Sequence, residues 1–446
     1  MFFQNRMVLF VVSAILIIIP KTVLTDCVIS TNGDLGEPQP LIVNLNYTIR
    51  HPQSSDTVTF YTNESFILSC PGTHLQIGVG SQKLNFSEHE TAKNSATIFS
   101  NITCLEYPIQ IARSTNQTCE DGNQEIEIGF FGLLRLHQTF NNLLQQQNSR
   151  YPLFTFATDT LHPREAIRPS WINDDFYNFG GNISNKDANA LLYSGNQIAL
   201  LSSLTGYNSS TSNPYINYTA DLYLARGHLT AKADFVYGAQ QRLTFHMVNA
   251  APQWQTFNGR NWAYAEANAR DLASNYNLTL EIYTGTYGVM TLPHLQTHQD
   301  VEIYMYNDSQ GNKEFPVPLL FWKYMYEPIT QSGIVLVGIN DPYITNVSKA
   351  IVCNDIYSSI NWTTTFTRND TLNGYMYACA PDDFRKTVTY MPNLPLKYLL
   401  TLNSTYNSTS NSSFGTSSSV TICCTFWSIF VALILFICNN FLNKMC

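Results

Sequence analysis

Charged residues are scarce in this chain. They account for 13% of its 446 residues, and the formal net charge is −8. The molecule as a whole therefore does not attract a polyanion, and a site for one would need a local basic cleft. Cys-x-x-Cys pairs and Cys/His arrays are absent, which argues against a structural zinc site. No internal repeat of solenoid length is present either, which argues against a repeat architecture.

The N-terminus has the pattern of a secretory signal peptide. Arg6 precedes the apolar run Met7–Ile19, which is short for a membrane span, and we expect cleavage after Thr25. Sixteen Asn-x-Ser/Thr sequons follow, a density that predicts a protein of the secretory pathway carrying N-linked glycans. Their asparagines are Asn46, Asn63, Asn85, Asn101, Asn116, Asn182, Asn208, Asn217, Asn277, Asn307, Asn346, Asn361, Asn369, Asn403, Asn407 and Asn411.

The cysteines between the two ends of the chain agree with an oxidising compartment. An even number of them predicts three disulfides. Cys353 and Cys379 stand alone downstream, and we expect them to pair with each other. The other four lie in the N-terminal third, where the three possible pairings stay open. They are Cys27, Cys70, Cys104 and Cys119.

The C-terminus has the pattern of an anchored surface protein. Residues 396–420 form a Ser/Thr/Asn-rich stalk without apolar periodicity. In the final segment, 421–446, the run Ile422–Cys438 is at the short limit for a membrane span, and only Lys444 flanks it. Small residues around Gly415 also fit a cleaved lipid-anchor signal. Both a lipid anchor, slightly favoured, and a single span remain open, and both place the protein on the extracellular side of the membrane.

Two folded regions are expected between these ends. Residues 26–123 contain short alternating runs with Gly, Pro and Ser between them, which predicts a small disulfide-linked β-rich module. Residues 124–395 have a mixed character, so the fold class is α+β. The helices expected there are Phe140–Gln147 and Asn258–Asn275. The strands expected there are Leu192–Leu204, Arg242–Val248, Leu280–Tyr287, Val317–Trp322 and Ile334–Val337.

Residues with chemical potential are concentrated in 221–285. Arg226 and His228 flank a glycine after a strand-like segment, and Asn258 stands where a helix begins, as an asparagine N-cap would. Glu266 and Arg270 follow on one helix face. Hydrolysis of a phosphodiester needs such a base, cation ligand and positive charges. Each residue also has a structural explanation, because the Glu and Arg fit an i,i+4 pair and the Asn a plain cap.

The order and spacing of these residues resemble the DNA/RNA non-specific endonuclease family. The family's signature reads Asp-Arg-Gly-His, then Asn-x-x-Pro-Gln, then an Asn, and then Glu and Arg along a helix. This chain has Arg226-Gly-His228, Asn249-Ala-Ala-Pro-Gln253 and Asn258, followed by Glu266 and Arg270. The form Leu-Ala-Arg-Gly-His-Leu is similar to the secreted arthropod branch, which includes double-stranded-RNA-degrading and salivary endonucleases.

The resemblance implies a ββα-metal nuclease core, a β-hairpin and helix that hold one metal ion, within the mixed α/β domain. His228 would be the general base, and Asn258 would bind Mg²⁺, with Mn²⁺ as a substitute. Glu266 would orient a metal-bound water. Arg226 and Arg270 would offset charge in the transition state.

Further residues are implied around this core. Asn249 would hold the site together by hydrogen bonds. Arg168, with Arg164 behind it, is the candidate for an upstream phosphate-binding arginine. A basic track near the site would come from Lys232, Arg242 and Arg260.

One residue departs from the family pattern. Ala225 stands where the wider family has an acid, which puts the orientation and basicity of His228 in question. The sequence therefore favours an extracellular, membrane-tethered, Mg²⁺-dependent endonuclease acting on DNA or RNA, double-stranded RNA included, with little sequence specificity. The alternative is a catalytically silent surface protein that binds or takes up nucleic acid. Oligomeric state stays open.

Overall fold

A computed structural model of the chain describes residues 27–401, apart from short gaps, together with residues 425–426. The gaps are 32, 47, 53–56, 62–63, 80–81, 86–88, 94–100, 119–123, 131–137, 143–146, 154–167, 174–175, 177–188, 277, 308–312 and 364–366. The expected signal peptide, and most of the expected stalk and C-terminal anchor, lie outside the described residues. Within the described part of the chain, no helix combines the length and apolarity needed to cross a membrane.

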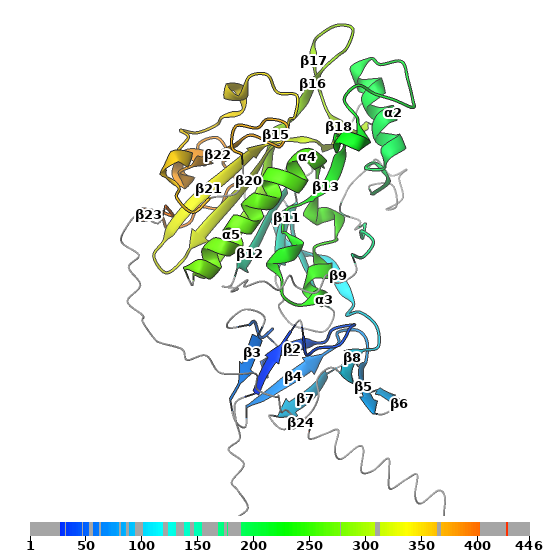
Figure 1. Ribbon diagram of the computed structural model, residues 1–446, viewed down its shortest axis with the longest axis vertical. Helices are drawn as coiled ribbons and strands as arrows, with labels where there is room; N and C mark the ends of the chain where they lie inside the picture. Colours follow the sequence, from blue (N-terminus) through cyan, green and yellow to red (C-terminus); the bar gives the residue numbers. More distant parts are fainter. Residues whose placement is uncertain are drawn as a thin grey trace, which may run out of the picture.

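The N-terminal module consists of three small antiparallel sheets (Figure 1), with the strand orders β1-β3, β2-β4-β7-β24 and β6-β5-β8. The Cys70–Cys104 disulfide, with a Cα–Cα distance of 5.6 Å, joins the end of β4 to β8. A β-rich, disulfide-linked module is thus confirmed. Its strands are β1 (Cys27–Ser30), β2 (Leu41–Val43), β3 (Thr57–Phe60), β4 (Ser65–Ser69), β5 (Leu75–Val79), β6 (Gln82–Asn85), β7 (His89–Lys93), β8 (Ile102–Cys104) and β24 (Thr425–Phe426).

A nine-stranded sheet forms the larger region, in the order β22-β21-β20-β15-β12-β11-β10-β9, with β23 parallel to β21. The boundary expected after residue 123 falls between β9 and β10, which pair with each other, so the sheet begins before that boundary. Its strands are β9 (Gln110–Thr118), β10 (Gln124–Phe130), β11 (Gln138–Asn142), β12 (Gln147–Leu153), β15 (Leu280–Val289), β20 (Pro318–Glu327), β21 (Ser332–Ile339), β22 (Met376–Cys379) and β23 (Tyr398–Leu399).

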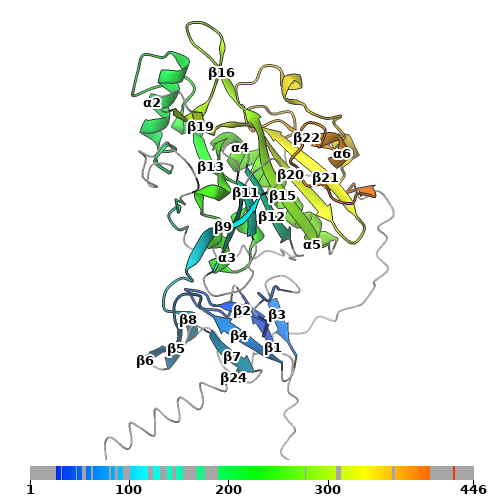
Figure 2. The same cartoon turned by 180° about the vertical axis from the view of Figure 1, so that it is seen from behind.

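The central strands of this sheet are buried on both faces. Side chains alternate along a strand, so Phe321 and Leu336 pack with helix α5 (Ala263–Asn275), which lies across one face in Figure 1. Their neighbours Trp322 and Val337 pack with Phe384 of α6 (Pro381–Phe384) on the opposite face, seen in Figure 2. The expected Cys353–Cys379 disulfide is confirmed on that side.

Shorter elements surround the sheet. The remaining hairpins are β13 (Leu224–His228) with β14 (Ala250–Trp254), β16 (Thr291–Pro293) with β17 (Asp300–Glu302), and β18 (Tyr304–Asn307) with β19 (Lys313–Pro316). The other helical elements are α2 (Ser194–Thr205), η3 (Tyr218–Ala220), η4 (Lys232–Asp234), α3 (Gly238–Leu243), η5 (Met247–Asn249), α4 (Gln255–Phe257), the π-turn η6 (Asn258–Trp262), η7 (Val347–Ala350) and η8 (Tyr357–Ser359).

Three expected elements were wrong. Leu192–Leu204 is mostly helix α2, whose buried Gln197, Leu201 and Thr205 recur every four residues. Arg242–Val248 contains the end of α3 and a 3₁₀ turn, because its backbone bonds are local. Of Phe140–Gln147, the described residues 140–142 belong to β11 and Gln147 to β12, where pairing with β10 and β15 overrides local preference. The helix at 258–275 and the three strands from Leu280 onward are confirmed.

The two regions share a hydrophobic core. Tyr237, Leu243 and Val248 of the larger region pack in one cluster with the strands of the N-terminal module. The amide of Gly238 donates to Oε1 of Gln39 at 2.7 Å. The N-terminal module therefore supports α3, which directly follows η4.

Two glycines make room for Phe257, the residue before Asn258. An added Cβ would lie 2.4 Å from the Phe257 ring at Gly338 and 2.1 Å at Gly374, and Gly374 also has a φ of +88°. Asn261 of the same turn donates to the Gly374 carbonyl at 2.8 Å. Close contacts with the backbone at Gly338 and Gly374 thus fix the turn that contains Asn258.

We expect Gly374→Ala to destabilise the protein by about 2 kcal/mol or more, because a Cβ there clashes with Phe257 and strains the backbone. Urea unfolding measures the change. Gly195→Ala is the matched control, since an added Cβ in α2 has nothing within 4 Å. The control should be neutral or stabilise by up to about 1 kcal/mol. Equal midpoints for the two variants would contradict this prediction.

Candidate active site

The β13–β14 hairpin fixes the two residues that open the sequence motif. Arg226 pairs with Pro252, and His228 with Ala250. The residue between them has no room for a side chain, because an added Cβ at Gly227 would lie 2.2 Å from Oε1 of Gln253. Since side chains alternate along a strand, Arg226 and His228 project to the side opposite Gly227.

A buried amide ties this hairpin to the central sheet. Asn340 is fully buried and accepts from the Trp254 amide at 2.9 Å. Its own amide donates to the carbonyls of Pro252 at 3.2 Å and Pro318 at 2.8 Å. The register of β14 is therefore linked directly to β20.

A helix follows β14 without a loop. It starts at Gln255 with α4, continues through the π-turn and runs on as α5, so the expectation that Asn258 caps the helix was wrong. Asn258 instead opens the π-turn, and such turns often occur at functional sites. Its Nδ2 donates to Oε1 of Gln255 at 3.1 Å. This bond leaves Oδ1 of Asn258 as an available acceptor.

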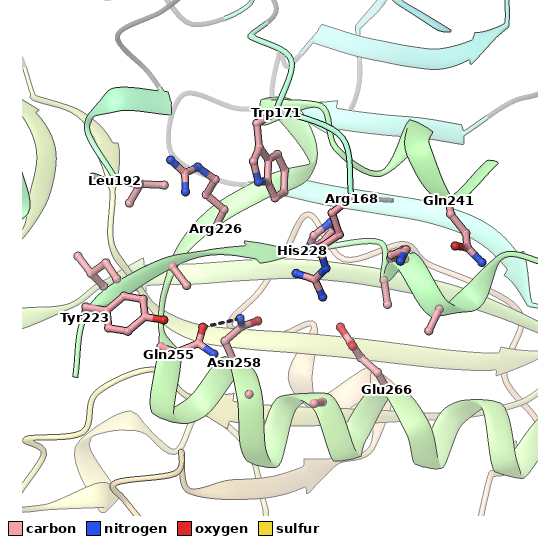
Figure 3. A pocket seen from close by; sticks show the side chains of 17 residues that line it. Arg168, Trp171, Leu192, Tyr223, Arg226, His228, Gln241, Gln255, Asn258 and Glu266 are labelled. Carbon is pink, nitrogen blue, oxygen red and sulfur yellow. Dashed lines mark hydrogen bonds between the residues drawn. The ribbon is translucent and has the colours of Figure 1, made fainter. Parts of the chain in front are cut away.

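The hairpin and the helix form two walls of one pocket of about 970 Å³. Figure 3 shows Asn258 and Glu266 on the helix, facing the strand that carries His228. Arg168 and Trp171 also line the pocket, on the side of the strand that faces away from the helix. Six of the expected site residues line the pocket: Arg168, Arg226, His228, Lys232, Asn258 and Glu266.

The His228 ring lies in an apolar environment. Its ring centroid is 4.8 Å from that of Trp171 and 5.0 Å from that of Phe245. Nε2 is buried without a hydrogen-bond partner. Burial, reinforced by the charges of Arg168 and Lys232, lowers the pKa of the imidazole to about 3. The ring is thus neutral over the whole physiological range, as a general base must be.

The Arg226 guanidinium lies on the opposite side of the pocket from the helix. Its Nε donates to Oδ1 of Asn189 at 2.6 Å, and Nη2 donates to the Asn189 carbonyl at 2.8 Å. The guanidinium also lies 5.3 Å from the centre of the Tyr193 ring. These contacts come from Asn189 and Tyr193, just before α2, and they fix the Arg226 side chain before any ligand binds.

Four buried or half-buried charges act on one another, and one of them, Glu266, lines the pocket. Arg270 does not line the pocket but forms an ion pair with Asp234 at 2.8 Å. Lys323, only 1% exposed, donates to Oγ1 of Thr284 at 2.8 Å. Burial raises the pKa of Glu266 to about 7; Lys323 opposes the rise, Asp234 adds to it and Arg270 opposes it. The four charges therefore act on one another as a group.

The remaining expected residues that the structure describes do not line the pocket. Asn249 is fully buried; its Oδ1 accepts from the Thr230 amide at 2.9 Å, and its Nδ2 donates to two carbonyls. It holds the turns on either side of the hairpin together. Arg260 is exposed and does not line the pocket. Arg242 stacks on Tyr107 at 3.9 Å, so it does not belong to a basic track, and Arg164 lies outside the described residues.

The donor set suits a hard cation with few protein ligands. No group of three or more His, Cys, Asp or Glu side chains able to hold a metal is present in the described part of the chain. Oδ1 of Asn258 faces the same pocket as Glu266. Mg²⁺ keeps most of its water and needs only one or two protein oxygens. The residues that line this pocket therefore fit a hard divalent cation such as Mg²⁺.

Three contributors were missed from the sequence. Lys323 is the one charged residue within the apolar run 318–326, a signal that could have marked it. Asp234 and Trp171 gave no such signal, because their contacts with Arg270 and His228 join distant segments.

A β-hairpin and helix that place a neutral histidine opposite an amide and a carboxylate define a site of the ββα-metal nuclease class. A model of the DNA/RNA non-specific endonuclease family matches residues 140–384, more than half of the chain. This protein belongs to that family.

Curated relatives match shorter parts of the chain. A protein named salivary endonuclease from Lutzomyia longipalpis is 33% identical over 30% of this chain and 31% of its own length. Salivary protein Tsal2A from Glossina morsitans morsitans is 28% identical over 38% of this chain and 42% of its own length. The matches thus span less than half of these relatives. A solved EndoG/EndoGI complex covers 60% of this chain and 89% of its own, at 11% identity and a TM-score of 0.29.

We expect Asp234→Ala to destabilise the protein by about 3 kcal/mol, because it leaves a largely buried arginine without its partner. Glu302→Ala is the control, since it breaks the Lys313–Glu302 pair, whose side chains are 47% and 49% exposed. That change should cost about 1 kcal/mol or less. Chemical denaturation of both variants measures the difference, and equal losses would refute the buried charge group as a stabilising feature.

Proposed function

We propose that this protein is an extracellular, membrane-tethered, Mg²⁺-dependent endonuclease that hydrolyses phosphodiester bonds of DNA and RNA, double-stranded RNA included, with little sequence specificity. The observation that carries this proposal is the convergence of His228, Asn258 and Glu266 on one pocket. Family membership and the names of the salivary relatives support it. The export and anchor signals in the sequence support the extracellular, tethered location and N-linked glycans.

In this proposal each residue has one role. His228 takes a proton from the attacking water; its Nε2 is buried without a hydrogen-bond partner among the described residues. Asn258 holds the cation through Oδ1, and Glu266 orients water beside it. When bound, Mg²⁺ stabilises negative charge on the phosphate and on the leaving oxygen.

Three cations and one carboxylate line the pocket, so it is locally positive although the chain is negative overall. The cations are Arg168, Arg226 and Lys232, and the carboxylate is Glu266. A concave basic site of this kind attracts a phosphodiester backbone without reading its bases. Arg270 acts indirectly in this proposal, since its guanidinium is paired with Asp234.

The alternative is a silent surface protein that binds or takes up nucleic acid. The charge lining the pocket fits both functions. A binding protein, however, has no need of a desolvated neutral histidine opposite a cation ligand. The enzyme is therefore the favoured proposal.

His228→Ala should reduce cleavage of plasmid DNA and of double-stranded RNA by about a hundredfold to ten-thousandfold, the usual loss for a general base. The assay uses the purified protein with Mg²⁺, with Mn²⁺ and with chelator, and gel electrophoresis follows the products. His74→Ala, an exposed histidine of the N-terminal module, should cut as the parent does. No cleavage by the parent under any condition, or full activity of His228→Ala, would sink the enzyme proposal.

The pH dependence should follow Glu266 rather than His228. Its carboxylate form is present above its raised pKa of about 7 and is lost as the pH falls through that value. His228 stays neutral down to about pH 3. We therefore expect kcat to decline below about pH 7 in the parent, and a slower but flatter profile for Glu266→Gln. Glu302→Gln, which changes an exposed carboxylate, should keep the parent's profile; the same decline in Glu266→Gln would contradict the assignment.

A further inference from the structure

Among the described residues, no carboxylate or carbonyl is hydrogen-bonded to the His228 ring, the partner that usually orients a catalytic histidine. In most such sites a carboxylate or carbonyl binds the second ring nitrogen and fixes its orientation. The charged groups that act on His228 among the described residues are Arg168 and Lys232, both cations. Ala225, three residues before His228, has only a methyl side chain and cannot supply a negative charge. In the described part of the chain, no negative charge holds this ring.

Two aromatic rings pack against the His228 imidazole instead. Trp171 approaches His228 at a tilt of 48°, and Phe245 meets it edge-on at 83°. The Trp171 and Phe245 centroids are themselves 5.1 Å apart, so the three rings form one cluster. Tilted and edge-on contacts at these distances are the favourable geometries for aromatic pairs.

The backbone keeps Trp171 in position. The amide of the next residue, Ile172, donates to the Phe245 carbonyl at 2.9 Å, and the Met247 amide donates to the Ile172 carbonyl at 2.8 Å. Both the amide and the carbonyl of Ile172, the residue after Trp171, are thus bonded to the segment 245–247, which contains Phe245. The indole is a fixed part of the pocket wall, and Figure 3 places it beside His228.

We propose that Trp171 is a positioning residue: together with Phe245 it forms an aromatic clamp that orients the His228 imidazole and keeps water from its sides. The clamp does the work that a carboxylate does elsewhere, without adding a negative charge to a pocket that must accept a phosphodiester. This inference rests on the proposed function for its catalytic consequence. Its physical content, an aromatic clamp on a desolvated ring, does not depend on activity.

The clamp predicts separate effects on rate and on binding. Trp171→Leu keeps an apolar side chain but removes the ring, so kcat should fall by at least about tenfold while KM changes by less than about threefold. Trp171→Phe keeps a ring and should retain most of kcat. Tyr398→Leu is the control, because Tyr398 is a 64% exposed aromatic residue on β23 outside the pocket.

A titration of the histidine itself provides a readout that does not need activity. The chain has nine histidines, so the ¹³Cε1 signal of His228 is assigned as the one missing from His228→Ala. In the parent and in Trp171→Phe this signal should not titrate between about pH 5 and pH 8. In Trp171→Leu water reaches the ring, and its pKa should rise from about 3 toward the ordinary value of 6.5.

The outcomes separate this inference from the proposed function. A folded Trp171→Leu variant with the parent's kcat and an unchanged His228 signal overturns the clamp. If Trp171→Leu fails to fold, the Phe variant decides, since loss of kcat and a titrating His228 there would also overturn it. If the parent cuts no nucleic acid, the proposed function fails, and the titration alone decides whether the rings hold His228.

Discussion

The close contact between Gly227 and Gln253 is the constraint on which the rest of the site depends. Only a glycine fits at position 227 in the β13–β14 register, and that register places Arg226 and His228 on the same side of the strand. The helix starts directly after β14, so no loop absorbs an error between the hairpin and Asn258. A fully buried Asn340 extends the same register to the central sheet. Hairpin, helix and sheet therefore act as one rigid support, which a site with few metal ligands requires.

Charge is placed locally against the overall trend of the chain. The net charge is −8, yet two arginines and a lysine line one pocket, and the charges of Lys323, Arg270 and Asp234 act on its carboxylate, Glu266. Burying Lys323 and Asp234 costs desolvation energy, which their mutual attraction and the Arg270 ion pair offset. Burial raises the pKa of Glu266 and lowers that of His228, because it disfavours the charged form of each group. A few buried charges thus decide the chemistry of a chain that has few charges altogether.

The N-terminal module is part of the structural support of the site. Its strands share a core with Tyr237 and Leu243, and Gln39 accepts a hydrogen bond from the start of α3. Helix α3 directly follows η4, the turn that contains Lys232 and Asp234. The sheet also begins with β9, which lies before the boundary expected from composition. Strand pairing depends on tertiary context, so a boundary expected from composition can fall between two strands of the same sheet.

The sequence by itself determined the motif, the order of the site residues, the Cys353–Cys379 pair and the strands from Leu280 onward, because spacing and periodicity are local properties. It failed for α2 and for β11, where burial and strand pairing decide between helix and strand. Folding brings Trp171 to His228 and Asp234 to Arg270, and it places Lys323 close enough for its charge to act on Glu266. These contacts join segments far apart in the chain, and no local pattern encodes which distant residues will meet in a packed core.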